Sequence, residues 1–189
     1  MFFRNVFKEL SDETLMEKIS EGSERALEVI YNRYSQPLLR YFYRMLWKNR
    51  ELAEDFLQDI FIKILRVKNF DSTRMFSTWI YSVAHNMCKN EYRKQAFRTS
   101  AKLNINEVAQ EEISIQLDHN SFNKIVEDAL REGDEDISTM FVLRFELDME
   151  VSEIARVLNC PEGTIKSRLF YLKKKLASQL CQYKTVLKN

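Results

Sequence analysis

Glycine, proline and cysteine are scarce in this sequence of 189 residues, which contains 3 Gly, 2 Pro and 3 Cys. Because glycine and proline weaken helices most, their scarcity favours helix along the whole chain, and we expect an all-α protein. Cys88, Cys160 and Cys181 are widely separated, which fits neither a disulfide framework nor a metal motif. His85 lies one helical turn before Cys88 without further candidate ligands beside it, so we expect neither a metal site nor a cofactor.

Long apolar runs and targeting segments are also missing. The sequence has no run of about 18 apolar residues, so no membrane-spanning helix is expected. Its first residues are soon followed by charges, unlike a signal peptide, and a cytoplasmic location is expected. We find no catalytic carboxylate pair, nucleophile–base set or phosphate loop. The chain is therefore not expected to be an enzyme.

The formal net charge of +1 does not decide for or against nucleic acid as a partner. The distribution of charge is more informative, because residues 51–59 and 127–136 are acidic whereas residues 89–98 and 166–175 are basic. A chain with separate basic and acidic faces can bind DNA and a basic protein together.

The stretch from Val151 to Leu176 predicts two short helices joined by a tight turn. The first helix has an apolar face, then Asn159-Cys160-Pro161 interrupts the pattern, and the second helix has its own apolar face. These faces consist of Val151, Ile154, Ala155 and Leu158, and of Ile165, Leu169, Leu172 and Leu176. Pro161 suits the first position of a helix. The pattern is typical of a helix-turn-helix, whose second helix enters the DNA major groove.

On the opposite side of the second helix lie Ser167, Tyr171 and Lys174, flanked by Lys166. Arg168 is nearer the apolar stripe, so we expect it to contact a phosphate rather than a base. Phe170 can meet a thymine methyl group or a protein neighbour. The alternative is an ordinary amphipathic hairpin with a solvated basic face.

An acidic helix is predicted from Glu51 to Leu65. Its inward positions are Leu52, Ala53, Phe56, Leu57, Ile60 and Ile64, which leaves Glu54, Asp55, Gln58 and Asp59 outward. This outward face is either solvated or a docking surface for a basic partner.

A loop from Val67 to Met75 precedes a helix from Phe76 to Gln95. The loop combines Phe70 with Lys68 and Arg74, and can grip an unstacked base unless Phe70 packs into the core. The expected core stripe of the helix is Phe76, Ile80, Val83, Ala84 and Met87. A second face contains Trp79, Asn86, Asn90 and Arg93, bordered by Lys89, which suits a partly melted duplex. The alternative places Trp79 in the core and leaves the amides solvated.

The predicted organisation has a lead helix in residues 1–22, a helical domain in 23–95, a linker in 96–121, a second helical domain in 122–182 and a tail in 183–189. Ser11 and Ser23 are expected helix caps, and Pro37 a kink or boundary. Helices are also expected from Phe122 to Leu130 and from Ile137 to Leu147, and a frayed helical piece from Glu107 to Ile113. Apolar positions of the first two helices are expected to pack against the helix-turn-helix, namely Ile125, Val126, Leu130, Ile137, Met140, Phe141 and Phe145.

Four segments resemble a bacterial RNA polymerase sigma factor of the sigma-70 family, extracytoplasmic-function (ECF) group. Residues 53–61 (AEDFLQDIF) resemble its acidic polymerase-docking helix, and residues 76–86 (FSTWIYSVAHN) its promoter-melting segment. Residues 89–94 (KNEYRK) resemble the basic end of the melting helix, and residues 161–169 (PEGTIKSRL) its recognition helix. The resemblance implies two helical domains and core RNA polymerase, promoter DNA and an anti-sigma factor as partners.

The resemblance also implies roles for individual residues. Contacts to the minus-thirty-five element are expected from Thr164, Lys166, Ser167, Arg168, Tyr171 and Lys174. Contacts to the minus-ten element are expected from Lys68, Asn69, Phe70, Arg74, Trp79, Asn86, Lys89, Asn90 and Arg93. Polymerase contacts are expected from Glu54, Asp55, Gln58 and Asp59.

The chain departs from the pattern of the family it resembles at three positions in the helix-turn-helix region. Tyr171 replaces an arginine of some relatives, Glu150 replaces a serine cap, and Asp148 replaces a turn glycine. Aspartate tolerates a left-handed turn better than most residues, so the motif is retained.

Two other functions are alternatives to a sigma factor. One is a stand-alone helix-turn-helix regulator with a helical sensing or dimerisation domain, and the other is a helical adaptor or polymerase sequestrator.

Overall fold

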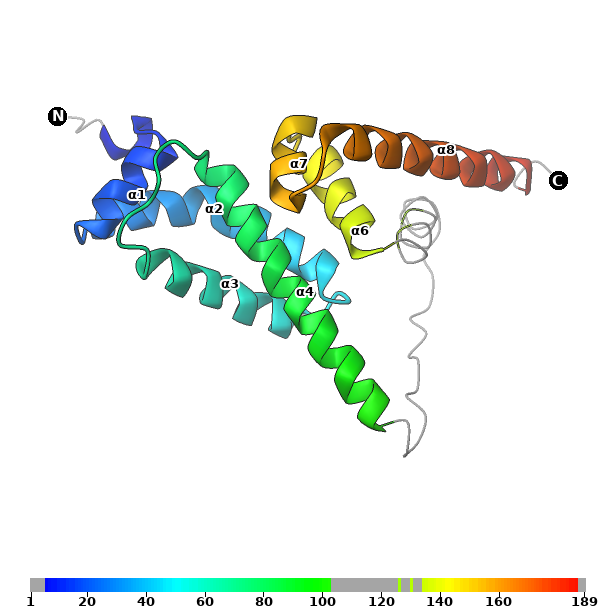
Figure 1. Ribbon diagram of the computed structural model, residues 1–189, viewed down its shortest axis with the longest axis horizontal. Helices are drawn as coiled ribbons and strands as arrows, with labels where there is room; N and C mark the ends of the chain where they lie inside the picture. Colours follow the sequence, from blue (N-terminus) through cyan, green and yellow to red (C-terminus); the bar gives the residue numbers. More distant parts are fainter. Residues whose placement is uncertain (1–5, 103–125, 127–129, 131–133, 187–189) are drawn as a thin grey trace. The chain divides into compact units, whose positions relative to one another are not determined.

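The structure is a computed structural model that describes residues 6–102, 126, 130 and 134–186 (Figure 1). Every regular element within these residues is a helix, which confirms the all-α prediction. The chain divides into two compact units, one holding residues 1–88 and 156–158, the other residues 89–155 and 159–189. Each unit is described by itself.

The first unit contains a 3₁₀ turn, η1 (Val6–Glu9), then α1 (Asp12–Ser20), α2 (Glu24–Met45), α3 (Arg50–Leu65) and the start of α4 (Phe76–Lys102). The expected caps are confirmed, because the side chains of Ser11 and Ser23 accept hydrogen bonds from Thr14 N–H and Ala26 N–H. Asn49 caps α3 in the same way. These side chains satisfy amide groups that have no partner within the helix.

Pro37 is predicted to mark a kink or a boundary, and of these two the boundary is wrong, because α2 continues through it to Met45. Its neighbours Leu38 and Tyr41 are fully buried, and this packing outweighs the hydrogen bond that proline removes. The helix that begins at Phe76 runs to Lys102 rather than ending at Gln95.

The core of the first unit is formed by apolar side chains from all four helices. Its fully buried large members include Leu15, Met16, Ile30, Leu38, Tyr41, Phe42, Leu46, Ile60, Ile64, Phe76 and Ile80. In α4, Phe76, Ile80 and Ala84 are buried as predicted, but Val83 and Met87 are only half-buried. Tyr81 and Cys88 take their place, and Tyr81 packs edge-on against Tyr41 with 5.7 Å between ring centres.

The second unit contains α6 (Glu135–Phe141), a π-helical turn η2 (Val142–Glu146), α7 (Val151–Leu158) and α8 (Glu162–Val186). A cluster of Val126, Leu130 and Leu172 is buried, with Ile137, Phe141 and Leu176 packed against it. Phe145, expected to pack against the helix-turn-helix, is 43% exposed, and its ring meets α8 at Lys173, whose Nζ lies 5.6 Å from the ring centre. The wider π turn changes the register after Phe141, so that Val142 and Leu143 are buried instead.

Other predictions fall outside the described residues. The frayed piece from Glu107 to Ile113 lies there, as do most of the predicted linker and most of the helix from Phe122 to Leu130. Of that last helix, Val126 and Leu130 are described, and both are helical and buried.

Candidate nucleic-acid interface

The turn between α7 and α8 has the backbone geometry of a helix-turn-helix. Asn159 adopts a left-handed conformation with φ of 51°, and Cys160 N–H donates to Ala155 O at 3.0 Å. Asparagine is one of the few residues that tolerates this conformation. Pro161 directly precedes α8, and its carbonyl accepts from Thr164 N–H at 2.9 Å. The break predicted from the sequence is therefore a tight turn that directs the chain straight into α8.

The start of α7 is built without a serine cap, because Glu150 stands directly before its first residue. Asp148 has a φ of 51°, as expected for a residue that replaces a turn glycine. Glu153 Oε2 accepts from Glu150 N–H at 2.8 Å, which is one half of a capping box. Arg144 Nη1 donates to Met149 O at 2.8 Å and holds the approach to the helix. Glu153 thus satisfies an amide at the helix start in a chain that lacks the serine.

The two sides of α8 differ as predicted. Ile165, Leu169 and Leu172 are buried, whereas Lys166, Ser167, Tyr171 and Lys174 are exposed, and Thr164 is half-buried in the first turn. Phe170 is 63% exposed and lies edge-on to Tyr171, with ring centres 5.6 Å apart. Lys166 forms an exposed ion pair with Glu162 at 3.3 Å, which a phosphate can displace because such pairs contribute little.

Arg168 differs from the other candidate contacts on α8. Its Nη1 lies 3.3 Å from Asp136 Oδ2 and 3.7 Å from Asp134 Oδ2. The prediction that it contacts a phosphate rested on helical spacing alone, and spacing does not show a partner 32 residues away in the sequence. The guanidinium has protein partners in the absence of DNA.

A second contact on α8 was also missed. Lys173 Nζ lies 5.6 Å from the centre of the Phe145 ring, within the range of a cation–π contact. Phe145 also packs against Phe141 at 5.2 Å. The π turn that exposes Phe145 has no clear sequence signal, so this pairing was not predictable from helical spacing.

The loop before α4 is held by side-chain contacts of its own and from α1. Asp71 Oδ1 accepts from Thr73 N–H at 3.1 Å and from Thr73 Oγ1 at 2.6 Å, and Asp71 Oδ2 lies 3.2 Å from Arg74 Nε. The hydrogen bonds from Thr73 are the main reason why the pKa of Asp71 is lowered. Glu13 Oε1 accepts from Phe76 N–H at 2.9 Å, so a residue of α1 caps α4.

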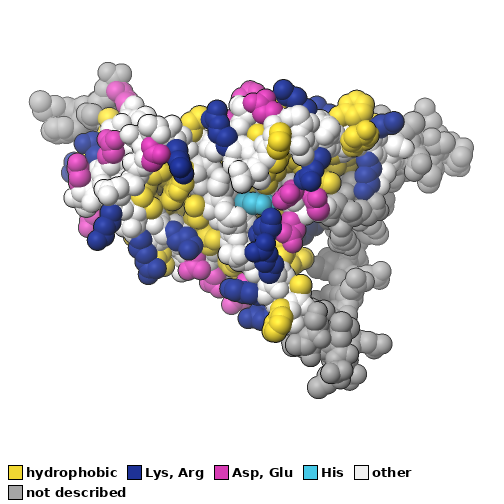
Figure 2. Space-filling view, viewed as in Figure 1, with side chains coloured by type: hydrophobic (Ala, Val, Ile, Leu, Met, Phe, Trp, Pro, Cys, Tyr) yellow, Lys and Arg dark blue, Asp and Glu magenta, His cyan; other side chains and the backbone are white. Residues whose placement is uncertain are grey.

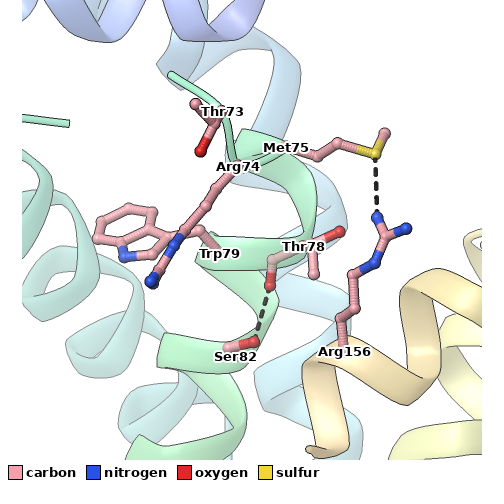
Figure 3. Close-up of a pocket in the computed structure, with 7 residues that line it drawn as sticks. All are labelled: Thr73, Arg74, Met75, Thr78, Trp79, Ser82 and Arg156. Carbon is pink, nitrogen blue, oxygen red and sulfur yellow. Dashed lines mark hydrogen bonds between the residues drawn. The ribbon is translucent and has the colours of Figure 1, made fainter. Parts of the chain in front are cut away.

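Phe70 and Trp79 are both half-buried. The sequence left two alternatives open for these rings, contact with an unstacked base or burial in the core, and the observed burial lies between them. Their ring centres are 5.6 Å apart, and each also contacts the buried ring of Phe76. Trp79, Arg74 and Thr73 line a pocket together with Met75, Thr78 and Ser82 (Figure 3). The loop and the first turns of α4 therefore form one continuous aromatic and polar surface.

Further along α4, Asn86, Asn90 and Arg93 are exposed and Lys89 is half-buried. In the loop, Lys68 and Asn69 are exposed. Lys, Arg, Asp and Glu side chains are interspersed on the face drawn in Figure 2, so positive charge is not collected in a single patch there.

The predicted docking face on α3 is exposed, because Glu54, Asp55, Gln58 and Asp59 all point outward. Glu54 is paired with Arg50 at 2.8 Å. The opposite side buries Ala53, Leu57, Ile60, Phe61 and Ile64, whereas the predicted core positions Leu52 and Phe56 are only half-buried. Sequence reasoning missed Ile62 and Leu65, which are 44% and 55% exposed. They continue the acidic face by one helical turn.

Within the described ranges, no helix has the length and apolar character needed to cross a bilayer. No three His, Cys, Asp or Glu side chains in the same part of the chain are grouped so as to hold a metal ion.

Comparisons with known families match both units. Residues 30–98 match the model of sigma-70 region 2, and residues 134–176 match the model of sigma-70, region 4. The ECF RNA polymerase sigma-E factor of Haemophilus influenzae is 26% identical, covering 92% of this chain and 97% of that protein. The ECF RNA polymerase sigma factor SigW of Bacillus subtilis is 27% identical, covering 87% of this chain and 94% of that protein.

Solved structures support the fold. CnrH, solved in complex with the cytosolic domain of CnrY, superposes with a TM-score of 0.67 at 22% identity, covering 90% of this chain and 97% of that one. RpoE of Bartonella quintana, solved with the anti-sigma factor NepR, gives a TM-score of 0.60 at 23% identity, covering 77% of this chain and 91% of that one.

Proposed function

Because the chain belongs to the sigma-70 family and directs transcription initiation as an ECF RNA polymerase sigma factor, we propose that two helical domains of the chain contact one promoter at two places. The N-terminal domain contacts the minus-ten element, and the C-terminal domain contacts the minus-thirty-five element. The proposed domains are residues 23–95 and 122–182, with the first extended by the longer α4.

The observation that carries the minus-thirty-five assignment is the exposed side of α8. Lys166, Ser167, Tyr171 and Lys174 are exposed beside a turn that has helix-turn-helix geometry, and Thr164 lies in the first turn. Hydroxyl groups and lysines at the start of a recognition helix can contact base edges and phosphates. Tyr171 gives this face an aromatic edge in place of a guanidinium, so its base preference differs from that of relatives with arginine there.

We assign the minus-ten element to the loop and to the exposed line on α4. Lys68, Asn69, Phe70 and Arg74 receive an unstacked base, and Trp79, Asn86, Lys89, Asn90 and Arg93 contact the melted strand. Unstacking costs a few kcal/mol per base. Stacking on an aromatic side chain returns about 1–3 kcal/mol per base. The half-buried Trp79 suits this role because its indole is held by Phe70 and Phe76 without being covered.

Polymerase binding is assigned to the outward side of α3. Glu54, Asp55, Gln58 and Asp59 supply a hydrogen-bonding acidic surface, and the exposed Ile62 supplies an apolar centre beside it. Protein interfaces commonly combine an apolar core with a polar rim. Once the chain is bound, the second DNA contact becomes intramolecular, which raises the effective concentration of α8 at the promoter.

The proposal includes a location and a regulator. Core polymerase and the chromosome lie in the bacterial cytoplasm, and we place the chain there. CnrH and the Bartonella quintana RpoE were each solved with a partner, named for RpoE as an anti-sigma factor. We therefore expect an anti-sigma factor for this chain.

The melting role is tested by Trp79→Ala in polymerase reconstituted with the full chain. Removing the indole takes away a stacking surface used only once the strands separate, so open-complex formation should fall at least tenfold (about 1.4 kcal/mol). Binding to core polymerase should stay within about twofold. Open complexes are measured by permanganate reactivity, and polymerase binding by titration.

Trp47→Ala is the matched control. Trp47 is a tryptophan of the same unit, is 52% exposed and belongs to none of the proposed contact surfaces. It should leave open-complex formation unchanged. Equal losses of melting and of polymerase binding in Trp79→Ala would contradict the role given to this indole.

A further inference from the structure

The guanidinium of Arg168 on α8 lies close to two carboxylates of the same unit. Asp136 Oδ2 is 3.3 Å from Arg168 Nη1, and Asp134 Oδ2 is 3.7 Å from the same atom. All three side chains are partly shielded from solvent, with exposed fractions of 36% for Arg168, 33% for Asp136 and 56% for Asp134. The contact joins residues that are far apart in the sequence, so it connects two helices rather than stabilising one.

Asp134 also has a second partner, which fixes the orientation of its carboxylate. Its Oδ1 accepts from Ile137 N–H at 2.8 Å and caps α6, while its Oδ2 faces Arg168. One carboxylate therefore joins the first turn of α6 to the recognition helix. Ile137 itself packs against the buried cluster that contains Leu172 of α8. The ion pairs thus continue an apolar contact between the same two helices.

The position of Arg168 around α8 explains why its side chain reaches α6. At about 100° per residue, it lies between the buried side formed by Ile165, Leu169 and Leu172 and the exposed side that contains Ser167 and Tyr171. Apolar packing alone is non-directional and allows a helix to rotate slightly about its axis. A planar guanidinium that pairs with fixed carboxylates resists such rotation.

We propose that Arg168 is a positioning residue, which sets the rotation of α8 through Asp134 and Asp136, rather than a phosphate contact. Holding the helix in one rotation keeps Lys166, Ser167 and Tyr171 aimed at the bases, and small errors in such aim weaken recognition. This inference rests on the proposed function of α8, and it changes the role predicted for Arg168 from the sequence.

The first test separates charge from geometry. Arg168→Lys keeps the positive charge, which suffices for a phosphate contact, but loses the planar fork. Asp134→Asn/Asp136→Asn removes both negative charges, while the amide introduced at position 134 retains an oxygen that can cap α6. Transcription by reconstituted polymerase is compared on a promoter with an intact minus-thirty-five element and on one with that element scrambled. If Arg168 is a positioning residue, both variants reduce the ratio of transcription from the intact promoter to transcription from the scrambled promoter by about threefold or more.

A phosphate contact predicts the opposite pattern. Arg168→Lys would then keep the ratio near its original value. The Asp134→Asn/Asp136→Asn variant would keep or raise it, because the guanidinium would be released towards DNA and nearby negative charge would be removed. Either result overturns the inference. Thermal unfolding of each variant shows whether the fold is retained.

The salt dependence of promoter binding provides a second measurement that does not depend on the size of the loss. Lys174→Ala removes a proposed phosphate contact and should reduce the slope of log K against log salt by about 1. Arg168→Ala should weaken binding with an unchanged slope. A slope reduced as in Lys174→Ala would overturn the positioning role.

Lys166→Ala distinguishes this inference from the proposed function. Lys166→Ala can reduce the ratio of transcription from the intact promoter to that from the scrambled one while the Arg168 and aspartate variants leave this ratio unchanged. That result rejects the positioning role alone. No loss in any of these variants rejects the assignment of α8 itself. The charge exchange Asp136→Arg/Arg168→Asp should recover part of the loss seen in each single variant.

Discussion

Glu13 of α1 accepts a hydrogen bond from Phe76 N–H at the start of α4, at 2.9 Å. Burial raises the pKa of its carboxyl, but hydrogen bonds from Phe76 N–H, its own N–H and Ser11 lower it. The resulting pKa is below the usual 4.5. The native state therefore binds fewer protons than the unfolded state near this pH. The stability that Glu13 supplies is present above pH 4.5 and is lost as pH falls through the lower folded pKa.

We predict that Glu13→Gln lowers the free energy of unfolding by about 1 kcal/mol at pH 7, since the carboxylate is only half-buried and solvent screens it. The difference from the unmodified protein should shrink as pH falls below 4.5. Urea unfolding across this pH range measures it. Glu17→Gln, at an exposed position one turn along α1, is the control. A difference independent of pH would contradict the capping role.

Individual side chains show where sequence reasoning succeeds and where it stops. The outward positions of Asp55, Ser167 and Tyr171 follow from helical spacing, because each helix buries one side. The partners of Arg168 and Glu13 do not follow from spacing, since they belong to other helices. Which distant elements meet is a result of tertiary packing, and no local pattern records it.

At the scale of the element, the turns around α7 depend on two left-handed residues, Asp148 and Asn159. We predict that Asp148→Gly stabilises the protein by about 0.5 kcal/mol, because removal of the left-handed strain exceeds the added freedom of the unfolded chain. The ion pair of Asp148 with Arg144 spans 3.9 Å at a fully exposed side chain and contributes little. Thermal unfolding measures the change.

Asp148→Ala is the matched substitution. Alanine has neither the freedom of glycine nor a polar side chain that favours this conformation, so it should destabilise the protein by about 1 kcal/mol. Equal stability of the glycine and alanine variants would show that the left-handed conformation at this position imposes no strain.

Helix boundaries were less predictable than helix faces. Local rules allow a kink or a boundary at Pro37 and place a helix end at Gln95, but the chain remains helical at both. Buried neighbours hold the first helix together through its proline. After Gln95 the sequence has no glycine or proline to stop α4, so its fading apolar pattern was mistaken for a linker. The caps at Ser11 and Ser23 were predictable, because capping depends only on neighbouring residues.

At the scale of the whole molecule, α3 should connect the chain to polymerase by charge. We predict that Asp55→Lys weakens binding to core polymerase at least tenfold (about 1.4 kcal/mol), because like charges then face each other in the complex. Glu21→Lys makes the same change in net charge at an exposed position outside the proposed face, and should change affinity less than twofold. Fluorescence titration of labelled protein with core polymerase measures both.

The order of segments along the chain was the part of the function that sequence could predict. The resemblance predicts an N-terminal part that resembles the polymerase-docking and promoter-melting segments and a C-terminal helix-turn-helix, and the matches to regions 2 and 4 follow in that order. A stand-alone regulator would not need region 2, and a pure adaptor would need neither DNA-contacting face. Base preference could not be predicted, because it depends on side chains such as Tyr171. Helical spacing shows that such a side chain faces outward but not which base it contacts.

The central claim is that two separate surfaces of this chain select one promoter when polymerase holds them together. Run-off transcription from a randomised promoter library, with core polymerase and the full chain, tests it most directly. The account predicts transcripts from templates that share two conserved blocks at a fixed spacing, with selection of the upstream block alone lost in Lys166→Ala. Transcripts that share one block, or an upstream block unaffected by Lys166→Ala, would contradict it.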